Sequence, residues 1–378
     1  MKRKVMTVVG TRPELIKMSR VIDKLDRAFD HVLVHTGQNH DDALARIFFE
    51  DLEIRAPDHH LAVAGGNAMT TVARVIEGVD ALLEAERPEA LVVYGDTNSG
   101  LCVLAAKRRR IPVFHLEAGN RCFDDRVPEE LNRRVIDHAS DVNLVLTEHA
   151  RRHLLAEGLP ADRIYKLGSH MPEVLAHQRE RIAASDVLER LGLVPDRFFV
   201  ASLHREENVD DPARLRHLID GLLALADSHG MPVIVSTHPR TRARLAVAGR
   251  DLAHGPIRFL PPFSFSDYIR LQQAAFCVIS DSGTITEEAS LLGLPAVSVR
   301  DSHERPEGVD AGVLVFCDAR ADRLVEAVRI VRDGFSRAAA DRRPVSDYEA
   351  GAVSDAVVRI VASLIDAVNE RTWRRPRI

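Results

Sequence analysis

The stretch that decides the fold is Val5-Met6-Thr7-Val8-Val9-Gly10-Thr11-Arg12-Pro13-Glu14. It joins a short apolar run to a polar turn, and the residues that follow carry the apolar spacing of a helix. Glycine permits a tight turn here, and Pro13 suits the first turn of a helix. The stretch therefore predicts a buried strand, a turn and a helix, which is the repeating unit of a parallel α/β sheet.

Short runs rich in valine and isoleucine recur along the chain, each followed by helical periodicity. Because parallel strands need a connecting segment that is usually a helix, this alternation predicts an α/β fold with two Rossmann-like domains. The expected strands are Val5–Val9, His31–Val34, Leu91–Tyr94, Val113–Leu116, Val142–Leu146 and Ile164–Leu167, then Phe198–Leu203, Val233–Ser236, Ile257–Leu260, Val278–Ser280 and Ala296–Val299.

We expect an N-terminal domain over residues 1–168 and a C-terminal domain over residues 169–352, joined by a connector and the helical stretch Glu173–Leu193. A chain of 378 residues fits two domains of ordinary size. Residues 353–378 form a last piece, whose helical stretch Val353–Val368 is expected to pack back on the first domain. The tail Arg371–Ile378, with the single tryptophan, is interpreted as a basic terminus.

Composition excludes several classes of protein. With 51 Lys+Arg against 56 Asp+Glu, the net charge of -5 offers no basic field to nucleic acid or anionic lipid. No apolar stretch is long enough to span a bilayer, and no signal peptide precedes the first strand. The four cysteines form no CxxC pair and the 17 histidines no HExxH motif, so neither a metal site nor disulfides are expected. A cytoplasmic location follows as an expectation.

Polar residues follow the expected strands, where ligands bind in open α/β sheets. After the first strand, Arg12 and Lys17 could face an anion, although a turn with solvated charges is the alternative. The loop lacks both GxGxxG and the Walker pattern, so no nucleotide cofactor is expected. Histidine and arginine also gather in three further segments, which suit diphosphate neutralisation better than metal ligation. These are His204-Arg205-Glu206-Glu207, His238-Pro239-Arg240 and Glu304-Arg305-Pro306-Glu307.

A second candidate loop is Asp281–Thr284, which leads into a helix carrying Glu287 and Glu288. Backbone N–H groups at a helix N-terminus, beside a small glycine, can bind a diphosphate without positive side chains. Glu288 could then accept hydrogen bonds from a ribose. The alternatives are a capping box, which stabilises a helix by about 0.5–2 kcal/mol, and a solvated helix carboxylate. The candidate diphosphate ligands are Ser282, Gly283 and Thr284.

Three acidic residues stand at strand ends or in the loops just after them in the first domain: Asp96, Glu117 and Glu129. Adjacent parallel strands would bring Asp96 and Glu117 together. Because a buried carboxylate without a partner is costly, the cluster indicates either acid–base chemistry or a salt-bridge network. The partners available for such a network are Arg121, Arg133 and Arg134.

In its ordered motifs the sequence resembles the non-hydrolysing UDP-N-acetylglucosamine 2-epimerase family over nearly its whole length. Eight motifs in the family's order and spacing are far more specific than any one of them. They are Gly10-Thr11-Arg12-Pro13-Glu14, Thr36-Gly37-Gln38, Gly95-Asp96-Thr97, Glu117-Ala118-Gly119, Pro128-Glu129-Glu130, His204-Arg205-Glu206, Asp281-Ser282-Gly283 and Glu304-Arg305-Pro306-Glu307.

The resemblance implies a fold similar to the GT-B glycosyltransferases, a homodimer, and an active site in an interdomain cleft that closes over a UDP-sugar. Asp96, Glu117 and Glu129 would be catalytic, with His204 close to the leaving group. Lys17 and Gln38 would line the sugar site. The remaining implied contacts are Arg12, His204, Ser282 and Gly283 for the diphosphate, Glu288 for the ribose and Phe263 or a neighbouring residue for the uracil.

The implied reaction interconverts UDP-GlcNAc and UDP-ManNAc by elimination and re-addition of UDP through a glycal, without metal or NAD. Two segments depart from the family pattern: Gly37–Asp42, where many members carry a stretch linked to allosteric activation, and Asp347–Gly351, which replaces a Gly-Asp-Gly motif. Together with the segments Glu117–Asp124 and Asp141-Val142-Asn143, these features resemble the capsule and O-antigen branch, whose C2 epimerases make UDP-N-acetyl-L-fucosamine from a 6-deoxy-talose precursor. A UDP-dependent glycosyltransferase, a hydrolysing epimerase and a catalytically silent nucleotide-sugar sensor are the rival hypotheses.

Overall fold

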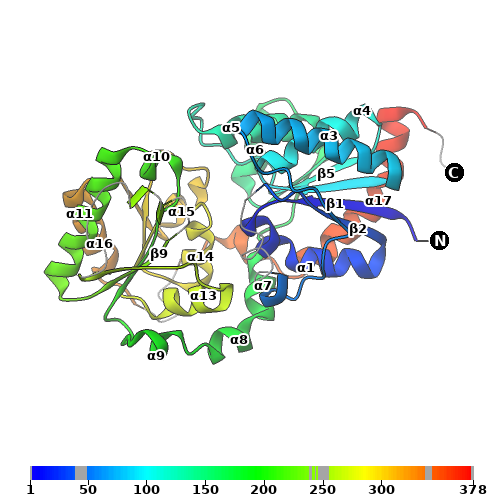
Figure 1. The fold of residues 1–378 in the computed structure, drawn as a ribbon. Helices are drawn as coiled ribbons and strands as arrows, with labels where there is room; N and C mark the ends of the chain where they lie inside the picture. The colour runs from blue at the N-terminus through cyan, green and yellow to red at the C-terminus, as the bar shows by residue number, and fades with distance from the viewer. Residues whose placement is uncertain are drawn as a thin grey trace. The chain divides into compact units, whose positions relative to one another are not determined.

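The computed structural model describes residues 2–38, 49–237, 241–242, 244–245, 255–336 and 343–375. The chain divides into two compact units. Unit 1 comprises Met1–His177 and Asp347–Ile378, and unit 2 comprises Gln178–Ser346. Each unit is a parallel sheet covered by helices (Figure 1). This architecture confirms the α/β class and the two Rossmann-like sheets expected from the sequence.

The sheet of unit 1 has the strand order β3-β2-β1-β4-β5-β6-β7 within the described residues, and every neighbouring pair is parallel. Because β1 pairs with β2 on one side and with β4 on the other, the chain reverses its direction across the sheet between β1 and β4. Such a switch point is where ligands bind in open α/β sheets. The strands are β1 Lys4–Val9, β2 Asp30–His35, β3 His59–His60, β4 Ala90–Tyr94, β5 Val113–Leu116, β6 Val142–Val145 and β7 Ile164–Lys166.

Helices cover both faces of this sheet (Figure 1). Valines of α3 pack with Met6 and Val8 on one face, together with residues of α4, while α1 and α17 pack against each other. The helices of this unit are α1 Arg12–Ala28, α3 Ala68–Glu86, η1 Asn98–Cys102, α4 Val103–Arg108, α5 Pro128–Ala139, α6 Glu148–Ala156, η2 Ala161–Arg163, α7 Met171–His177 and α17 Val353–Trp373, with η4 Ser346–Tyr348 at the join.

The C-terminal helix corrects one expectation. The sequence predicts only a basic terminus from Arg371, but α17 continues through Trp373, and Lys107 Nζ lies 4.7 Å from the centre of the indole ring. A cation over an aromatic face is attracted by the ring quadrupole, so the end of the helix has a packing partner. The tryptophan is therefore part of unit 1.

Unit 2 repeats the same topology, with the strand order β10-β9-β8-β11-β12-β13 and a switch point between β8 and β11. Residues of α11 and α16 cover one face of its sheet, and residues of α9, α13 and α14 cover the other. The strands are β8 Phe199–Ser202, β9 Val233–Ser236, β10 Ile257–Leu260, β11 Cys277–Ser280, β12 Ala296–Val299 and β13 Val315–Cys317. The helices are α8 Arg179–Ala184, α9 Val187–Leu191, α10 Glu206–Val209, α11 Pro212–His229, α13 Phe265–Ala274, α14 Ile285–Leu292, α15 Pro306–Ala311 and α16 Ala321–Arg332.

Two strands were not expected from the sequence. β3 and β13 are the short edge strands, of two and three residues, and each pairs with a single neighbour. The helical stretch expected over Glu173–Leu193 is divided among α7, α8 and α9. In the part of the chain that the structure describes, no helix is long and apolar enough to cross a membrane.

Candidate active site

The loops after β1 and β4 meet at the switch point of unit 1. A Cβ atom on Gly10 would collide with the hydroxyl groups of Thr36 and Ser99, which lie 2.8 Å from each other. Only glycine allows this approach of the backbone. Gln38 Oε1 accepts hydrogen bonds from the Ser99 hydroxyl at 2.7 Å and from the Ser99 N–H at 3.1 Å. The predicted residue Gln38 is thereby fixed at the switch point.

Glu14 ties the same two loops together from inside the protein. Its carboxylate accepts hydrogen bonds from the Gly10 N–H at 3.0 Å and from the Thr97 hydroxyl at 3.1 Å. Burial raises the pKa of Glu14 to about 7. The sequence prediction did not include Glu14 among the site residues, although a glutamate three residues into a helix is the usual place for a side chain that reaches back over the N-terminus.

Asp96 follows β4 and is held by an arginine. Arg133 of α5 donates from Nε to Asp96 Oδ2 at 2.8 Å, and its Nη2 lies 2.7 Å from the same oxygen. Nη1 of Arg133 reaches Glu130 Oε2 at 2.9 Å. Burial opposes the ionisation of Glu130, but the hydrogen bonds from the Cys122 N–H and from Arg133 outweigh it and lower its pKa. A salt-bridge network, one of the two interpretations of the carboxylate cluster, is therefore present around Asp96.

Glu117 follows β5, the strand beside β4, and has a cation of its own. Lys17 of α1 donates to Glu117 Oε2, and the Tyr94 hydroxyl donates to the same oxygen at 2.9 Å. Glu117 has a φ of 63°, a left-handed conformation that side chains other than glycine rarely adopt. The neighbouring strands therefore bring the loops of Asp96 and Glu117 to one edge of the sheet, as expected from their positions in the sequence.

A buried network fixes the loop that follows Glu117. Both oxygens of Asp137 accept from the Gly119 N–H at 3.2 Å, and Oδ2 also accepts from Arg121 at 2.7 Å. His115 Nε2 lies 2.7 Å from the Gly95 carbonyl oxygen, so the imidazole links the loops after β4 and β5. These contacts hold the backbone of the loop, and sequence spacing alone did not reveal them.

The remaining predicted residues of unit 1 lie on helix N-termini. Arg12 is the first residue of α1 and Glu129 the second residue of α5, and both side chains are half-buried. Glu129 therefore stands one residue before Glu130, whose carboxylate belongs to the network around Arg133. α5 thus carries Glu129 and the arginine that binds Asp96.

In unit 2, Asp281 ties together the two loops of the switch point. Its buried carboxylate accepts from the backbone N–H groups of His204 at 3.0 Å and of Arg205 at 3.0 Å, and from Asn208 Nδ2 at 3.0 Å. The same carboxylate lies 3.1 Å from His204 Nδ1. A carboxylate beside one imidazole nitrogen orients the ring and directs the other nitrogen away from it. The predicted residue His204 is therefore held in a defined orientation.

Gly283 lies in the loop after β11 and allows a carboxylate to approach. A Cβ atom at this position would collide with Glu304 Oε1, and Glu304 Oε2 is bound to Arg300 Nη2 at 2.7 Å. Arg205 Nη2 lies 3.6 Å from Glu304 Oε1. The backbone at Gly283 is therefore packed against charged groups from two other segments, the loop after β8 and the loop after β12.

The capping box considered for α14 is not formed. Thr284 is the N-cap residue, but its side chain makes no capping hydrogen bond, and Glu287 instead pairs with Arg305 at 3.0 Å. Both partners of this pair are buried. Glu288 is not a solvated carboxylate either, because it is buried and accepts from Gln272 Nε2 at 2.6 Å. The predicted residues Glu288 and Arg305 are thus held by contacts inside unit 2.

Three further predictions concern loops of unit 2. The Ser282 hydroxyl accepts from the Thr284 N–H at 3.3 Å and lies 3.0 Å from the Thr284 hydroxyl, which gives the turn before α14 its shape. Phe263 follows β10, is half-buried and packs against the core beneath α13 and α14. His238 lies outside the described residues. Among the described residues, no group of three or more His, Cys, Asp or Glu side chains could hold a metal ion.

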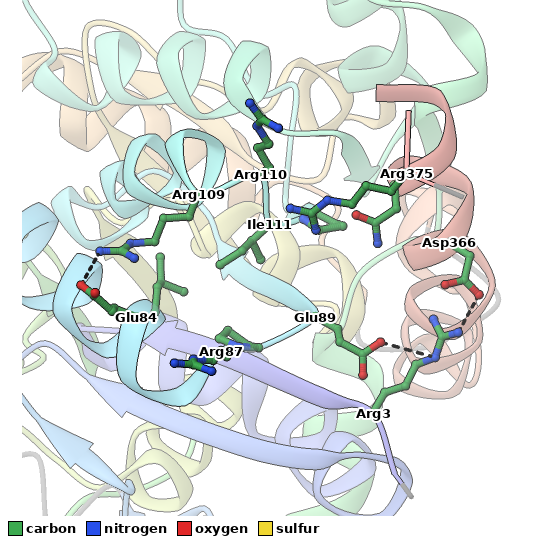
Figure 2. A pocket seen from close by; sticks show the side chains of 13 residues that line it. Arg3, Glu84, Arg87, Glu89, Arg109, Arg110, Ile111, Asp366 and Arg375 are labelled. Carbon is green, nitrogen blue, oxygen red and sulfur yellow. Dashed lines mark hydrogen bonds and ion pairs between the residues drawn. The ribbon is translucent and has the colours of Figure 1, made fainter. Parts of the chain in front are cut away.

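A cavity of about 630 Å³ lies at the opposite edge of the unit 1 sheet, where β1, β4 and β5 begin (Figure 2). Arg87 and Arg109 on its wall are the C-cap residues of α3 and α4, positions where the helix dipole favours cations. Arg109 also binds Asp80 at 2.5 Å and 2.7 Å. Arg3 on the same wall is paired with Glu89 and Asp366, so ion pairs within unit 1 hold this wall together. The carboxyl ends of the strands remain the candidate site.

Comparisons with known proteins identify relatives of this chain. A model of the UDP-N-acetylglucosamine 2-epimerase family matches residues 23–362. The chain is similar to the solved UDP-N-acetylglucosamine 2-epimerase of Rickettsia bellii, with a TM-score of 0.92 and 50% identity over 99% of this chain and 100% of that one. It is similar to the Methanocaldococcus jannaschii UDP-GlcNAc 2-epimerase, solved with UDP-GlcNAc and UDP, with a TM-score of 0.89 and 31% identity over 95% and 99%. A third relative is the UDP-2,3-diacetamido-2,3-dideoxy-D-glucuronate 2-epimerase of Pseudomonas aeruginosa, 35% identical over 86% of this chain and 91% of that protein.

Proposed function

Because this chain belongs to the UDP-N-acetylglucosamine 2-epimerase family, we propose that it is an isomerase that interconverts UDP-GlcNAc and UDP-ManNAc. The observation that carries the proposal is the pair of strand-end carboxylates. Asp96 and Glu117 follow the neighbouring strands β4 and β5, and each is held by its own buried cation. A glycosyltransferase shares the nucleotide site but has less need of several carboxylates in the first unit.

The chemistry explains why carboxylates are needed. The proton on C2 of the sugar is not acidic enough for direct removal at neutral pH. When the C1–O bond to UDP breaks, its electron pair leaves with UDP and C1 becomes positively charged, which carboxylates stabilise electrostatically. A carboxylate then takes the C2 proton, and the C–H electrons form the double bond of a glycal. Protonation of C2 on the opposite face and return of UDP to C1 give the epimer.

Two faces of C2 require two acid–base groups. Glu117 and Glu129 come from different elements, the loop after β5 and the start of α5, and so could approach C2 from different directions. Asp96, bound twice by Arg133, is proposed to stabilise the charge at C1. Lys17 and Gln38 are proposed to line the sugar site, since both are fixed at the same strand ends.

Unit 2 is proposed to hold the nucleotide. The turn before α14 offers backbone N–H groups to the diphosphate. His204, oriented by Asp281, is proposed to contact the leaving phosphate, and Glu288 the ribose. The further UDP contacts that we propose are the predicted residues Arg12, His238, Phe263, Ser282, Gly283, Thr284 and Arg305.

A homodimer is proposed from the surface of unit 1. The helices α3, α4 and α5 are neighbours, and each carries an exposed apolar side chain. The exposed fractions are 71% for Met69, 41% for Leu104 and 67% for Leu131. Exposed apolar side chains on neighbouring helices favour a protein interaction site, and a second copy of the chain is the proposed partner. A cytoplasmic location is also proposed, supported by the four free cysteines.

Deuterium incorporation tests the proposed reaction. Incubation with UDP-GlcNAc in heavy water is expected to place deuterium at C2 and to form the manno epimer. Proton NMR measures both changes. The Pseudomonas aeruginosa relative acts on a different UDP-sugar, so the 6-deoxy-L-talo analogue is tested in parallel. Exchange with that analogue alone would assign the chain to the fucosamine branch. Absence of exchange with every UDP-sugar tried would overturn the proposal.

A further inference from the structure

Two donors bind the same oxygen of the Glu117 carboxylate. The ammonium group of Lys17 and the hydroxyl group of Tyr94 donate to Oε2. The other oxygen, Oε1, faces Gly95, because it lies 3.7 Å from the position of a Cβ atom built on that glycine. The carboxylate therefore has one oxygen held by two donors and one directed toward the loop that carries Asp96.

Tyr94 is itself fixed. It is the last residue of β4, is 2% exposed, and pairs in register with Leu116, the residue before Glu117. Lys17 Nζ lies 5.7 Å from the centre of the phenol ring, and the ring of His170 meets it edge-on at 5.4 Å. The phenol oxygen thus has a fixed position relative to the carboxylate that it binds.

The type of donor matters for the chemistry. A phenol keeps its proton at neutral pH, so Tyr94 must be the donor and the carboxylate the acceptor. A hydrogen bond donated to a carboxylate favours its charged form and lowers its proton affinity. Lys17 acts in the same direction, and the two together decide how readily Glu117 takes a proton. The titratable groups that contact this pair are Lys17 from α1 and His170 before α7.

We propose that Tyr94 is a positioning residue that sets the direction and the proton affinity of the Glu117 carboxylate, so that Oε1 takes the C2 proton. This inference rests on the proposed function. In the step, the C2–H bond breaks, an O–H bond forms at Oε1, and the C–H electrons enter the glycal double bond as UDP leaves with the C1–O electrons. The phenol proton stays on Tyr94 throughout.

The test is Tyr94→Phe, which keeps the ring and removes the hydrogen bond. We expect kcat to fall about 10- to 100-fold with KM changed less than about threefold. The acid limb of the pH profile of kcat/KM should move to higher pH by about half to one unit, because Glu117 becomes easier to protonate. The matched control is Tyr165→Phe, which removes the hydroxyl of a half-buried tyrosine that donates to the Asp162 carbonyl at 3.0 Å. That variant should retain the wild-type profile.

A second measurement does not depend on turnover. In protein labelled with carbon-13 at the glutamate carboxyl carbons, the resonance missing in Glu117→Gln identifies Glu117. Its titration should move to higher pH in Tyr94→Phe. If kcat falls while neither the pH limb nor this titration moves, Tyr94 has only a packing role and the inference is wrong. If the wild-type protein shows no C2 exchange, the proposed function fails, while an unmoved titration still overturns the inference by itself.

Discussion

Arg133 binds Asp96 through two nitrogen atoms, 2.8 Å and 2.7 Å from the same carboxylate oxygen. Its third nitrogen lies 2.9 Å from Glu130, which is fully buried. One guanidinium group therefore serves a candidate catalytic carboxylate and a structural one. Because α5 supplies both Arg133 and Glu129, the position of this helix determines the arrangement of two of the three proposed catalytic acids.

Arg133→Met should destabilise unit 1. Removing Arg133 takes a buried cation from Glu130 and leaves it the partly exposed Arg134 at 3.2 Å, and we expect the free energy of unfolding to fall by about 3 kcal/mol. The single tryptophan, Trp373, lies in unit 1, so its fluorescence during urea unfolding reports on this unit. Arg126→Met is the control, because that side chain is 84% exposed in its pair with Asp124 and should contribute under about 1 kcal/mol. Equal losses in the two variants would contradict this account.

Glu117→Gln should separate chemistry from nucleotide binding. The amide cannot take the C2 proton, so exchange in heavy water should fall at least about a hundredfold. The dissociation constant of UDP, measured by calorimetry, should stay within about threefold, because the proposed nucleotide contacts belong to other residues. Loss of UDP binding together with exchange would instead identify Glu117 as a structural carboxylate.

Gly283→Ala should weaken the binding of UDP. The new methyl group would collide with Glu304, and the ion pair between Glu304 and Arg300 at 2.7 Å resists its withdrawal. We expect at least about a tenfold increase in the dissociation constant of UDP, equal to about 1.4 kcal/mol. Gly255→Ala is the matched control in the same unit, since nothing lies within 4 Å of a Cβ atom there. The proposed contact would be wrong if both variants bound UDP like the wild type.

Glu14→Gln should change how stability depends on pH. Burial raises the pKa of Glu14 from 4.5 to about 7, so the folded state retains a proton that the unfolded chain loses first. The stability contributed by protonated Glu14 is therefore complete below pH 4.5 and is lost as the pH rises to about 7. Relative to the wild type, the neutral variant should gain about 3 kcal/mol over this range. Urea unfolding of unit 1 at about pH 5 and about pH 8 measures the difference, and Glu77→Gln on the exposed side of α3 is the matched control.

Leu131→Glu should convert the proposed dimer to a monomer. A charge on the face formed by α3, α4 and α5 would have to be buried without a partner in the interface. Sedimentation velocity should show a fall to the mass of one chain, 41.9 kDa. Val194→Glu places the same charge at a residue of unit 2 that is 63% exposed, and should leave the mass unchanged. A wild-type chain that sediments as a monomer would refute the dimer directly.

The apolar runs predicted most of the fold because parallel strands buried on both faces consist almost entirely of such residues. The expected strands Val113–Leu116, Val233–Ser236 and Ile257–Leu260 have the observed limits. β3 was not predicted, because its two residues, His59 and His60, have no apolar pattern and form a strand only by pairing with β2. The C-terminal end of α17 was not predicted, because the residues around Trp373 are polar and the contact with Lys107 depends on the three-dimensional packing.

The candidate site was predictable in position but not in its contacts. Strand order brings Asp96 and Glu117 to one edge, and this follows from the alternation of strands and helices. The partners of these residues depend on the three-dimensional packing of distant segments. Glu287 shows the difference, because its spacing from Thr284 indicated a capping box, whereas a buried arginine from another segment binds it instead.

Unit 1 is assembled from both ends of the chain, with unit 2 inserted between them. α17 packs on α1 and is joined to unit 1 by ion pairs from Lys24 to Asp355 at 2.8 Å and from Arg3 to Asp366 at 2.6 Å. Because a chain leaves the ribosome from its N-terminus, unit 2 can fold before α17 has been synthesised. The side of α1 that α17 covers therefore stays open during translation, and a nascent chain that stalls before Val353 presents that surface to chaperones.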